Sequence, residues 1–70
     1  MGLVIDTPKA IEIAQKFLEE HHTTVDLKSC VLEDSTEGKI WIVTFDVGFL
    51  EEQIKKVKVN ADNGGILGYQ

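Results

Sequence analysis

Arginine is absent from the chain, and all seven of its basic residues are lysines. Twelve acidic residues outnumber them, so the formal net charge is −5 at pH 7. Arginine supplies the bidentate fork that reads guanine edges and clamps phosphate groups, and negative charge is repelled by nucleic acid and anionic lipid. The composition therefore argues against nucleic acid and against a membrane surface as partners.

Cysteine and long apolar runs are also scarce. Cys30 is the only cysteine, which excludes a disulfide within one copy of the chain. The first six residues, Met-Gly-Leu-Val-Ile-Asp, include no basic residue and only three consecutive large apolar ones, too few for a signal peptide or a membrane span. We therefore expect a cytoplasmic protein whose thiol is reduced.

The length of 70 residues suits one domain, spanning residues 1–70, with a thin margin of stability. Domains of this size usually gain stability from a disulfide, a metal ion or a second subunit. Because an internal disulfide is excluded and the sequence shows no cluster of metal ligands, we expect self-association into a homo-oligomer.

One segment has the periodicity of an amphipathic helix. Thr7 suits the cap position, and Pro8 suits the first helical position, where no amide donor is needed. Mostly apolar residues then recur at three- and four-residue steps, at Ala10, Ile13, Ala14, Phe17, Leu18 and His21. The β-branched residues that follow, Thr23–Val25, favour extended backbone, so the helix is predicted to end near His22.

Beyond the helix the apolar period shortens from about 3.6 residues to 2, which predicts strands. The first is expected over residues 25–31, with a bulge or a two-sided strand where Val31 and Leu32 break the alternation. The strongest is expected over Lys39–Val47, with four large apolar side chains on one face, at Trp41, Val43, Phe45 and Val47.

Two further strands are predicted after a connection over residues 48–53. Ile54–Ala61 would point Val57, Val59 and Ala61 inward, and Ile66–Tyr69 would pair back on it. Turn residues fill 34–38 and 62–65, and the Asn and Gly of the second turn tolerate the positive φ that hairpins need.

This order of elements predicts an α+β fold, in which one N-terminal helix packs on an antiparallel β-meander of three to four strands. The helix would cover one sheet face. The other face would carry Ile40, Ile42 and, with them, Leu32 and Ile54, which is too apolar for a surface that contacts only water.

The connection after the strongest strand carries a second apolar pair, Phe49 and Leu50. These residues either cap the core or form an exposed contact tip, and capping is the favoured interpretation. Taken together, the apolar positions outside the expected core define a predicted interaction surface, made of Ile40, Ile42, Phe49, Leu50 and Ile54.

Residue types that carry chemistry do not form a recognisable site. His21 and His22 are helical neighbours that point about 100° apart, so they cannot easily share a metal ion. Nothing near Cys30 in the sequence activates a thiol, and Asp62–Gly65 lacks the other residues of a calcium or phosphate loop. We therefore predict no catalytic residue, no metal site and no cofactor.

The segment Val57–Leu67, V-K-V-N-A-D-N-G-G-I-L, resembles the C-terminal signature of PepSY domains, in which a strand V-x-V-D-A precedes a hairpin T-G-E-V/I-L. The helix, the strands and the aromatic strand agree with that family in order from Thr7 onward. Asn60, Asn63 and Gly65 stand where the family has Asp, Thr and Glu. The resemblance implies a helix-on-sheet domain that inhibits peptidases or regulates their local activity, in a family that is mostly extracytoplasmic.

Two functions from different classes remain open. The first is a non-enzymatic PepSY-like module that binds a protein or peptide, including a peptidase-related one, or binds itself through its sheet. The alternative is a small enzyme or ligand carrier whose pocket lies between helix and sheet or at a dimer interface.

Overall fold

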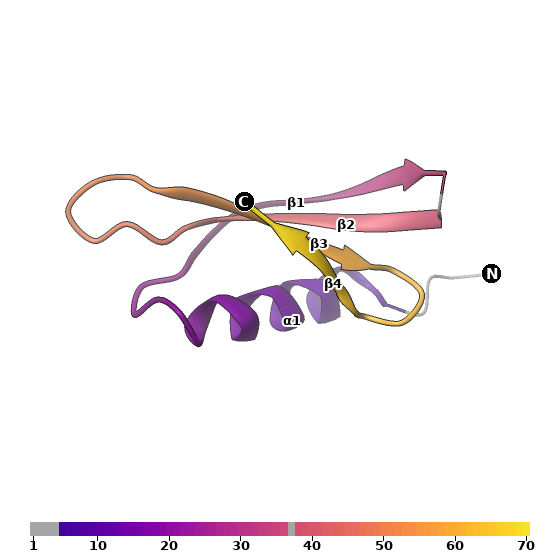
Figure 1. The fold of residues 1–70 in the computed structure, drawn as a ribbon, viewed down its shortest axis with the longest axis horizontal. Helices are drawn as coiled ribbons and strands as arrows, with labels where there is room; N and C mark the ends of the chain where they lie inside the picture. The colour runs from indigo at the N-terminus through magenta and orange to yellow at the C-terminus, as the bar shows by residue number, and fades with distance from the viewer. Residues whose placement is uncertain (1–4, 37) are drawn as a thin grey trace.

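The computed structural model describes residues 5–36 and 38–70. Its elements, in chain order, are α1 (Thr7–Glu19), β1 (Asp26–Ser35), β2 (Gly38–Asp46), β3 (Ile54–Asn60) and β4 (Ile66–Tyr69). The strands form one antiparallel sheet in the order β1-β2-β3-β4, and α1 lies along one of its faces (Figure 1). The predicted α+β fold is confirmed, with four strands.

The cap of α1 lies one residue earlier than predicted. Asp6, with extended backbone, is the N-cap, and its Oδ1 accepts a hydrogen bond of 3.1 Å from the amide of Lys9. Thr7 therefore belongs to the first turn, and the prediction of Thr7 as the cap is wrong. A carboxylate at this position also interacts favourably with the positive end of the helix dipole, which a hydroxyl cannot do as strongly.

The helix also ends earlier than predicted, at Glu19. The amides of His21 and His22 both donate to the carbonyl oxygen of Leu18, at 2.9 and 2.8 Å, which closes the last turn. The ring of His21 then lies edge-on to that of Phe17, with 5.5 Å between ring centroids. The two histidines therefore lie in the turn that ends the helix.

The core lies between α1 and the two central strands. Ala10, Ala14 and Leu18 are fully buried, and the two alanines let the helix approach the sheet closely. The predicted inward positions of the sheet are all buried as well, at Trp41, Val43, Phe45, Val47, Val57, Val59 and Ala61. The alternation that predicted these strands therefore predicted their core face correctly.

The bulge in β1 lies at Lys28, between the pairs Leu27–Phe45 and Ser29–Thr44. It does not lie where Val31 and Leu32 broke the alternation. Beyond it the register pairs Leu32 with Trp41, which puts Leu32 on the helix side of the sheet, so its predicted place on the other face is wrong.

The strand β1 also runs farther than predicted, to Ser35. Asp34 and Ser35, predicted to lie in a turn, belong to the strand, and Asp34 accepts a hydrogen bond of 2.7 Å from Lys39 Nζ in the paired strand. The second turn is confirmed, because Gly64 has a positive φ and Asn60 Oδ1 accepts the amide hydrogen bonds of Asp62 and Asn63.

Candidate interaction surface

The sheet face opposite α1, here called the open face, is covered by no segment that the structure describes (Figure 1). The strand register sets which side chains it carries. Val31 of β1 pairs with Ile42 of β2, and Ile40 lies two residues farther along the same strand. Val31 is 55% exposed, while Ile40 and Ile42 are half-buried. These three side chains form the apolar cluster of the open face.

Lysines lie beside this cluster on β3. Lys58 pairs with Ile42, and Lys56 pairs with Thr44, so both side chains belong to the open face. Both are exposed, and neither forms an ion pair with a residue that the structure describes. The open face therefore combines an apolar cluster with unneutralised positive charge, in a chain whose net charge is −5.

The connection between β2 and β3 has a defined shape. The Oδ1 atom of Asp46 accepts hydrogen bonds from the amides of Gly48 and Gln53, at 2.9 and 3.0 Å, and the amide of Val47 donates to the carbonyl of Gln53 at 2.8 Å. The bonds from Gln53 and Gly48, with Lys28 nearby, hold the pKa of Asp46 below its ordinary value. One carboxylate therefore closes the base of this loop.

At the end of this loop, the tip Phe49–Glu52 is turned outward. Phe49 is 85% exposed and Leu50 is 89% exposed, so the prediction that they cap the core is wrong. Figure 1 gives the reason, since the loop projects past the end of α1 and no helix surface lies under it. Glu51 and Glu52 follow directly and are exposed as well, so the tip joins two apolar side chains to two negative charges.

The five predicted surface residues therefore fall into two groups. Ile40 and Ile42 lie in the cluster at the middle of the sheet, and Phe49 and Leu50 lie at the tip. Ile54, 40% exposed, pairs with Asp46 at the base of the loop and lies between the two groups on the open face.

Sequence reasoning missed two members of this surface. Val31 was assigned to an irregular strand, and only the register shows that it shares a face with Ile42. Leu67 occupies a register shift in β4, between the pairs Lys58–Gly68 and Val59–Ile66. It is 49% exposed and lines a shallow hollow together with Lys58. Alternation alone gives no signal for a residue in a bulge.

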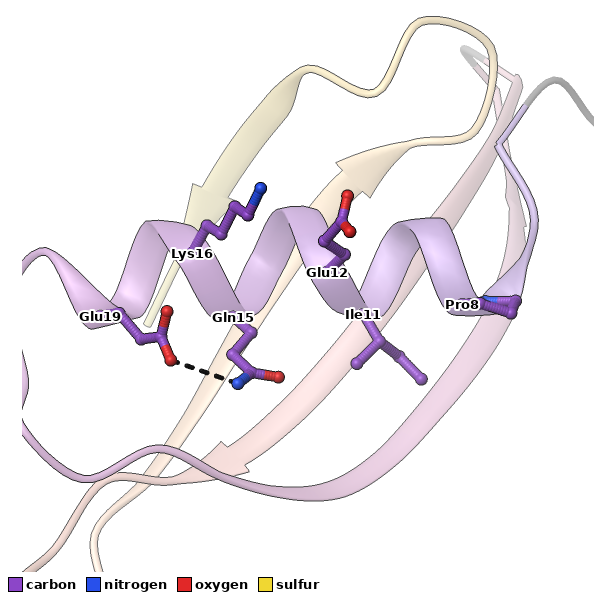
Figure 2. A pocket seen from close by; sticks show the side chains of 6 residues that line it. All are labelled: Pro8, Ile11, Glu12, Gln15, Lys16 and Glu19. Atoms are coloured by element: carbon purple, nitrogen blue, oxygen red, sulfur yellow. Dashed lines mark hydrogen bonds between the residues drawn. The ribbon is translucent and has the colours of Figure 1, made fainter.

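A shallow hollow also lies on the outer side of α1, where polar side chains predominate (Figure 2). Gln15 donates to Glu19 over 3.2 Å, and Lys9 donates to Glu12 over 3.0 Å. The second bond lowers the pKa of Glu12. Because these groups pair with each other along the helix surface, they do not converge on an enclosed space. The lining residues are Pro8, Ile11, Glu12, Gln15, Lys16 and Glu19.

The candidate nucleophile is partly buried. Cys30 pairs with Val43 on the helix side of β1, and burial raises the pKa of its thiol, which disfavours the reactive thiolate. Within residues 5–36 and 38–70, no three or more His, Cys, Asp or Glu side chains gather in a way that could hold a metal ion.

Comparisons of the chain with protein-family models, curated proteins and solved structures found no match. The resemblance to PepSY domains therefore stays a prediction. In the described part of the chain, α1 is the only helix, and it is too short and too polar to cross a membrane.

Proposed function

We propose that the protein is a binding module without catalytic activity, which recognises a protein or peptide, or a second copy of itself, through the open face. The observation that supports this proposal is the apolar cluster of Val31, Ile40 and Ile42 on a sheet face that no described segment covers. Uncovered apolar clusters on small proteins commonly mark binding surfaces, because water contact with them costs free energy that a partner removes.

The proposed binding is tested by one substitution in the centre of the cluster. Ile42→Asp would place a charge where the partner makes its apolar contact. Ile11→Asp makes the same change at a half-buried position on α1 that packs against the core and lies away from the open face. The immobilised protein and both variants, each shown to be folded by circular dichroism, would be used to capture partners. A partner is accepted only when its binding is reproduced with purified protein.

We expect Ile42→Asp to abolish this binding and Ile11→Asp to retain it. Equal binding by both variants would exclude the open face. A metabolite that raises the melting temperature, with no protein partner found, would instead favour the ligand-carrier alternative.

We further propose that the partner is peptidase-related, which the resemblance of Val57–Leu67 to PepSY domains supports. The purified protein would be added to metallopeptidases in a peptide-cleavage assay, with Ile42→Asp as the control. Inhibition by the unmodified protein alone is expected. Equal cleavage rates with and without it would remove the peptidase role and leave the binding role standing.

We also propose a cytoplasmic location, which a single reduced cysteine favours. Cell fractionation followed by detection of the protein would test it, and recovery from the medium or from an envelope fraction would exclude it.

A further inference from the structure

The two apolar groups of the proposed surface, the apolar cluster and the tip, lie at different positions along the strand direction. The apolar cluster is centred on Ile42, whereas Asp46 and its partner Ile54 mark the base of the loop. Four residues separate Ile42 from Asp46, which is about 13 Å along a strand. The tip projects farther still in the same direction (Figure 1).

Both apolar groups are accompanied by charged side chains. At the cluster, Glu33 on β1 pairs with Ile40, whereas the charged residues on β3 are lysines. The cluster has Lys56 and Lys58 beside it on β3, and the tip carries Glu51 and Glu52. None of these four side chains forms an ion pair with a residue in the described ranges. The β3 side of the cluster and the tip therefore complement each other in charge, and both groups present apolar side chains.

A two-fold rotation brings such halves together. If the axis runs across the strands near the Asp46–Ile54 pair, a second copy lies end for end on the open face of the first. The tip of each copy then covers the cluster of the other copy, and both contacts are equivalent, as in an isologous dimer. The loop joins β2 to β3, so its lateral position matches Ile42 on β2 and Lys58 on β3.

The dimensions of the molecule favour this occupant over a short peptide. A specific interface buries about 800 Å² on each partner. The molecule measures 42 × 18 × 16 Å, so an interface of that size requires most of its long side. A second copy has the required length and contacts both halves at once.

We propose that the open face is covered by a second copy of the chain. Phe49 and Leu50 of each copy lie on the apolar cluster of the other copy, and Glu51 and Glu52 face Lys56 and Lys58. This proposal rests on the proposed function, because it names the occupant of the same face. The contact is symmetric. Because it pairs exposed glutamates with exposed lysines, the affinity of the dimer should fall as the salt concentration rises.

The test uses light scattering on the full chain over roughly 10 to 500 µM, a range in which a moderate dimer dissociates measurably. We expect a dimer, and we expect Phe49→Ser with Leu50→Ser to be a folded monomer. A monomer throughout this range would overturn the dimer. It would leave the proposed function to be decided by the capture experiment with Ile42→Asp.

Paired charge reversals identify the contact itself. One variant carries Glu51→Lys and Glu52→Lys, so in its homodimer the lysines of each tip would face Lys56 and Lys58 of the other copy. The other variant carries Lys56→Glu and Lys58→Glu, so in its homodimer Glu51 and Glu52 of each tip would face the introduced glutamates of the other copy. Each variant alone should dimerise at least about tenfold more weakly than the unmodified protein. An equimolar mixture should recover dimers, because every tip then meets the opposite charge.

The matched control is Glu19→Lys with Glu20→Lys, an adjacent pair of exposed glutamates at the end of α1. It has the same net charge as the tip variant, so a mixture with the Lys56→Glu and Lys58→Glu variant shows what overall charge alone does. The control should dimerise by itself as the unmodified protein does, because its tip and cluster are unchanged, but it should not draw the Lys56→Glu and Lys58→Glu variant into dimers. Dimers that contain the Lys56→Glu and Lys58→Glu variant in both mixtures, such dimers in neither mixture, or a dimer that survives the apolar tip variant would each overturn the proposed contact.

Discussion

Gly48 and Glu51 approach each other so closely that a Cβ atom built on Gly48 would clash with the carbonyl oxygen of Glu51. The backbone of the loop, not a flexible side chain, occupies that space. Gly48→Ala should therefore force the loop into another conformation and lower the free energy of unfolding by about 1 to 3 kcal/mol, measured by urea denaturation.

The chain offers a matched control in Gly68 of β4, where an added Cβ atom would meet no atom within 4 Å outside that glycine and its two chain neighbours. Gly68→Ala should change the free energy of unfolding by less than about 0.5 kcal/mol. Equal losses for the two variants would show that glycine at position 48 is not required by the approach of Glu51.

The carboxylate of Asp46 should stabilise the loop in a pH-dependent way. Hydrogen bonds from Gln53 and Gly48 lower its pKa in the folded state, so its contribution is present above the ordinary carboxyl range and is lost as the pH falls through the lowered value. Below that pH, the protection of the Gly48 and Gln53 amides should fall, measured by NMR as their exchange rates relative to those of an unfolded peptide at the same pH.

Two variants separate the charge from the acceptor, because both bonds end on Oδ1 of Asp46. Asp46→Asn keeps an oxygen acceptor, and Asp46→Ala removes it. Near neutral pH the exchange rates should rise in the order unmodified protein, Asp46→Asn, Asp46→Ala, and Asp46→Asn should lose the acid dependence. Identical exchange in all three proteins would contradict this role of Asp46.

The core and the order of elements could be predicted from the sequence because both depend on local periodicity. Trp41, Val43 and Phe45 alternate strictly, and an antiparallel pair repeats every two residues, so the buried face follows directly. The cap was predicted one residue late because Asp6 and Thr7 are both good cap residues, and only the geometry of the first turn distinguishes them.

The candidate site was less predictable because it depends on register and on relative lengths. A polar residue in a bulge, Lys28, leaves no mark on the apolar pattern, yet it sets whether Val31 or Leu32 faces the helix. The exposure of Phe49 depends on where α1 ends relative to the loop. Neither quantity is encoded in a short window of residues.

Truncation of two phenylalanines four residues apart should lower the stability by very different amounts. Phe45 is fully buried between α1 and the sheet, so Phe45→Ala should lower the free energy of unfolding by about 3 to 5 kcal/mol. Phe49→Ala should lower it by less than about 0.5 kcal/mol, because its side chain already contacts water in the isolated chain. Denaturation at a low protein concentration measures both, and a large loss for Phe49→Ala would mean that the tip packs within its own copy.

The indole of Trp41 fixes the segment that precedes α1. Its Nε1 donates a buried hydrogen bond of 2.8 Å to the carbonyl oxygen of Ile5. Trp41→Phe would leave that acceptor unpaired and should cost about 1 to 3 kcal/mol of stability, measured by urea denaturation. Tyr69→Phe removes a polar group from a 45% exposed ring and should be nearly neutral. Equal effects of the two substitutions would show that the bond to Ile5 contributes nothing.

The thiol of Cys30 should react slowly for as long as the chain is folded. Burial raises its pKa above the ordinary value, so at a given pH a smaller fraction is thiolate than in the unfolded chain. Alkylation by iodoacetamide should therefore be slower in the folded protein, with its pH midpoint shifted upward, and urea should restore the ordinary midpoint.

The same shift gives Cys30 an effect on alkaline stability. Because the thiol is more basic in the folded state, its contribution to stability is complete below the unfolded thiol's pKa of about 8.5 and falls as the pH rises through the higher folded value. Cys30→Ser should flatten the decline in the free energy of unfolding just above that pH. An identical decline in both proteins would mean that the thiol is as well solvated in the folded chain as in the unfolded one.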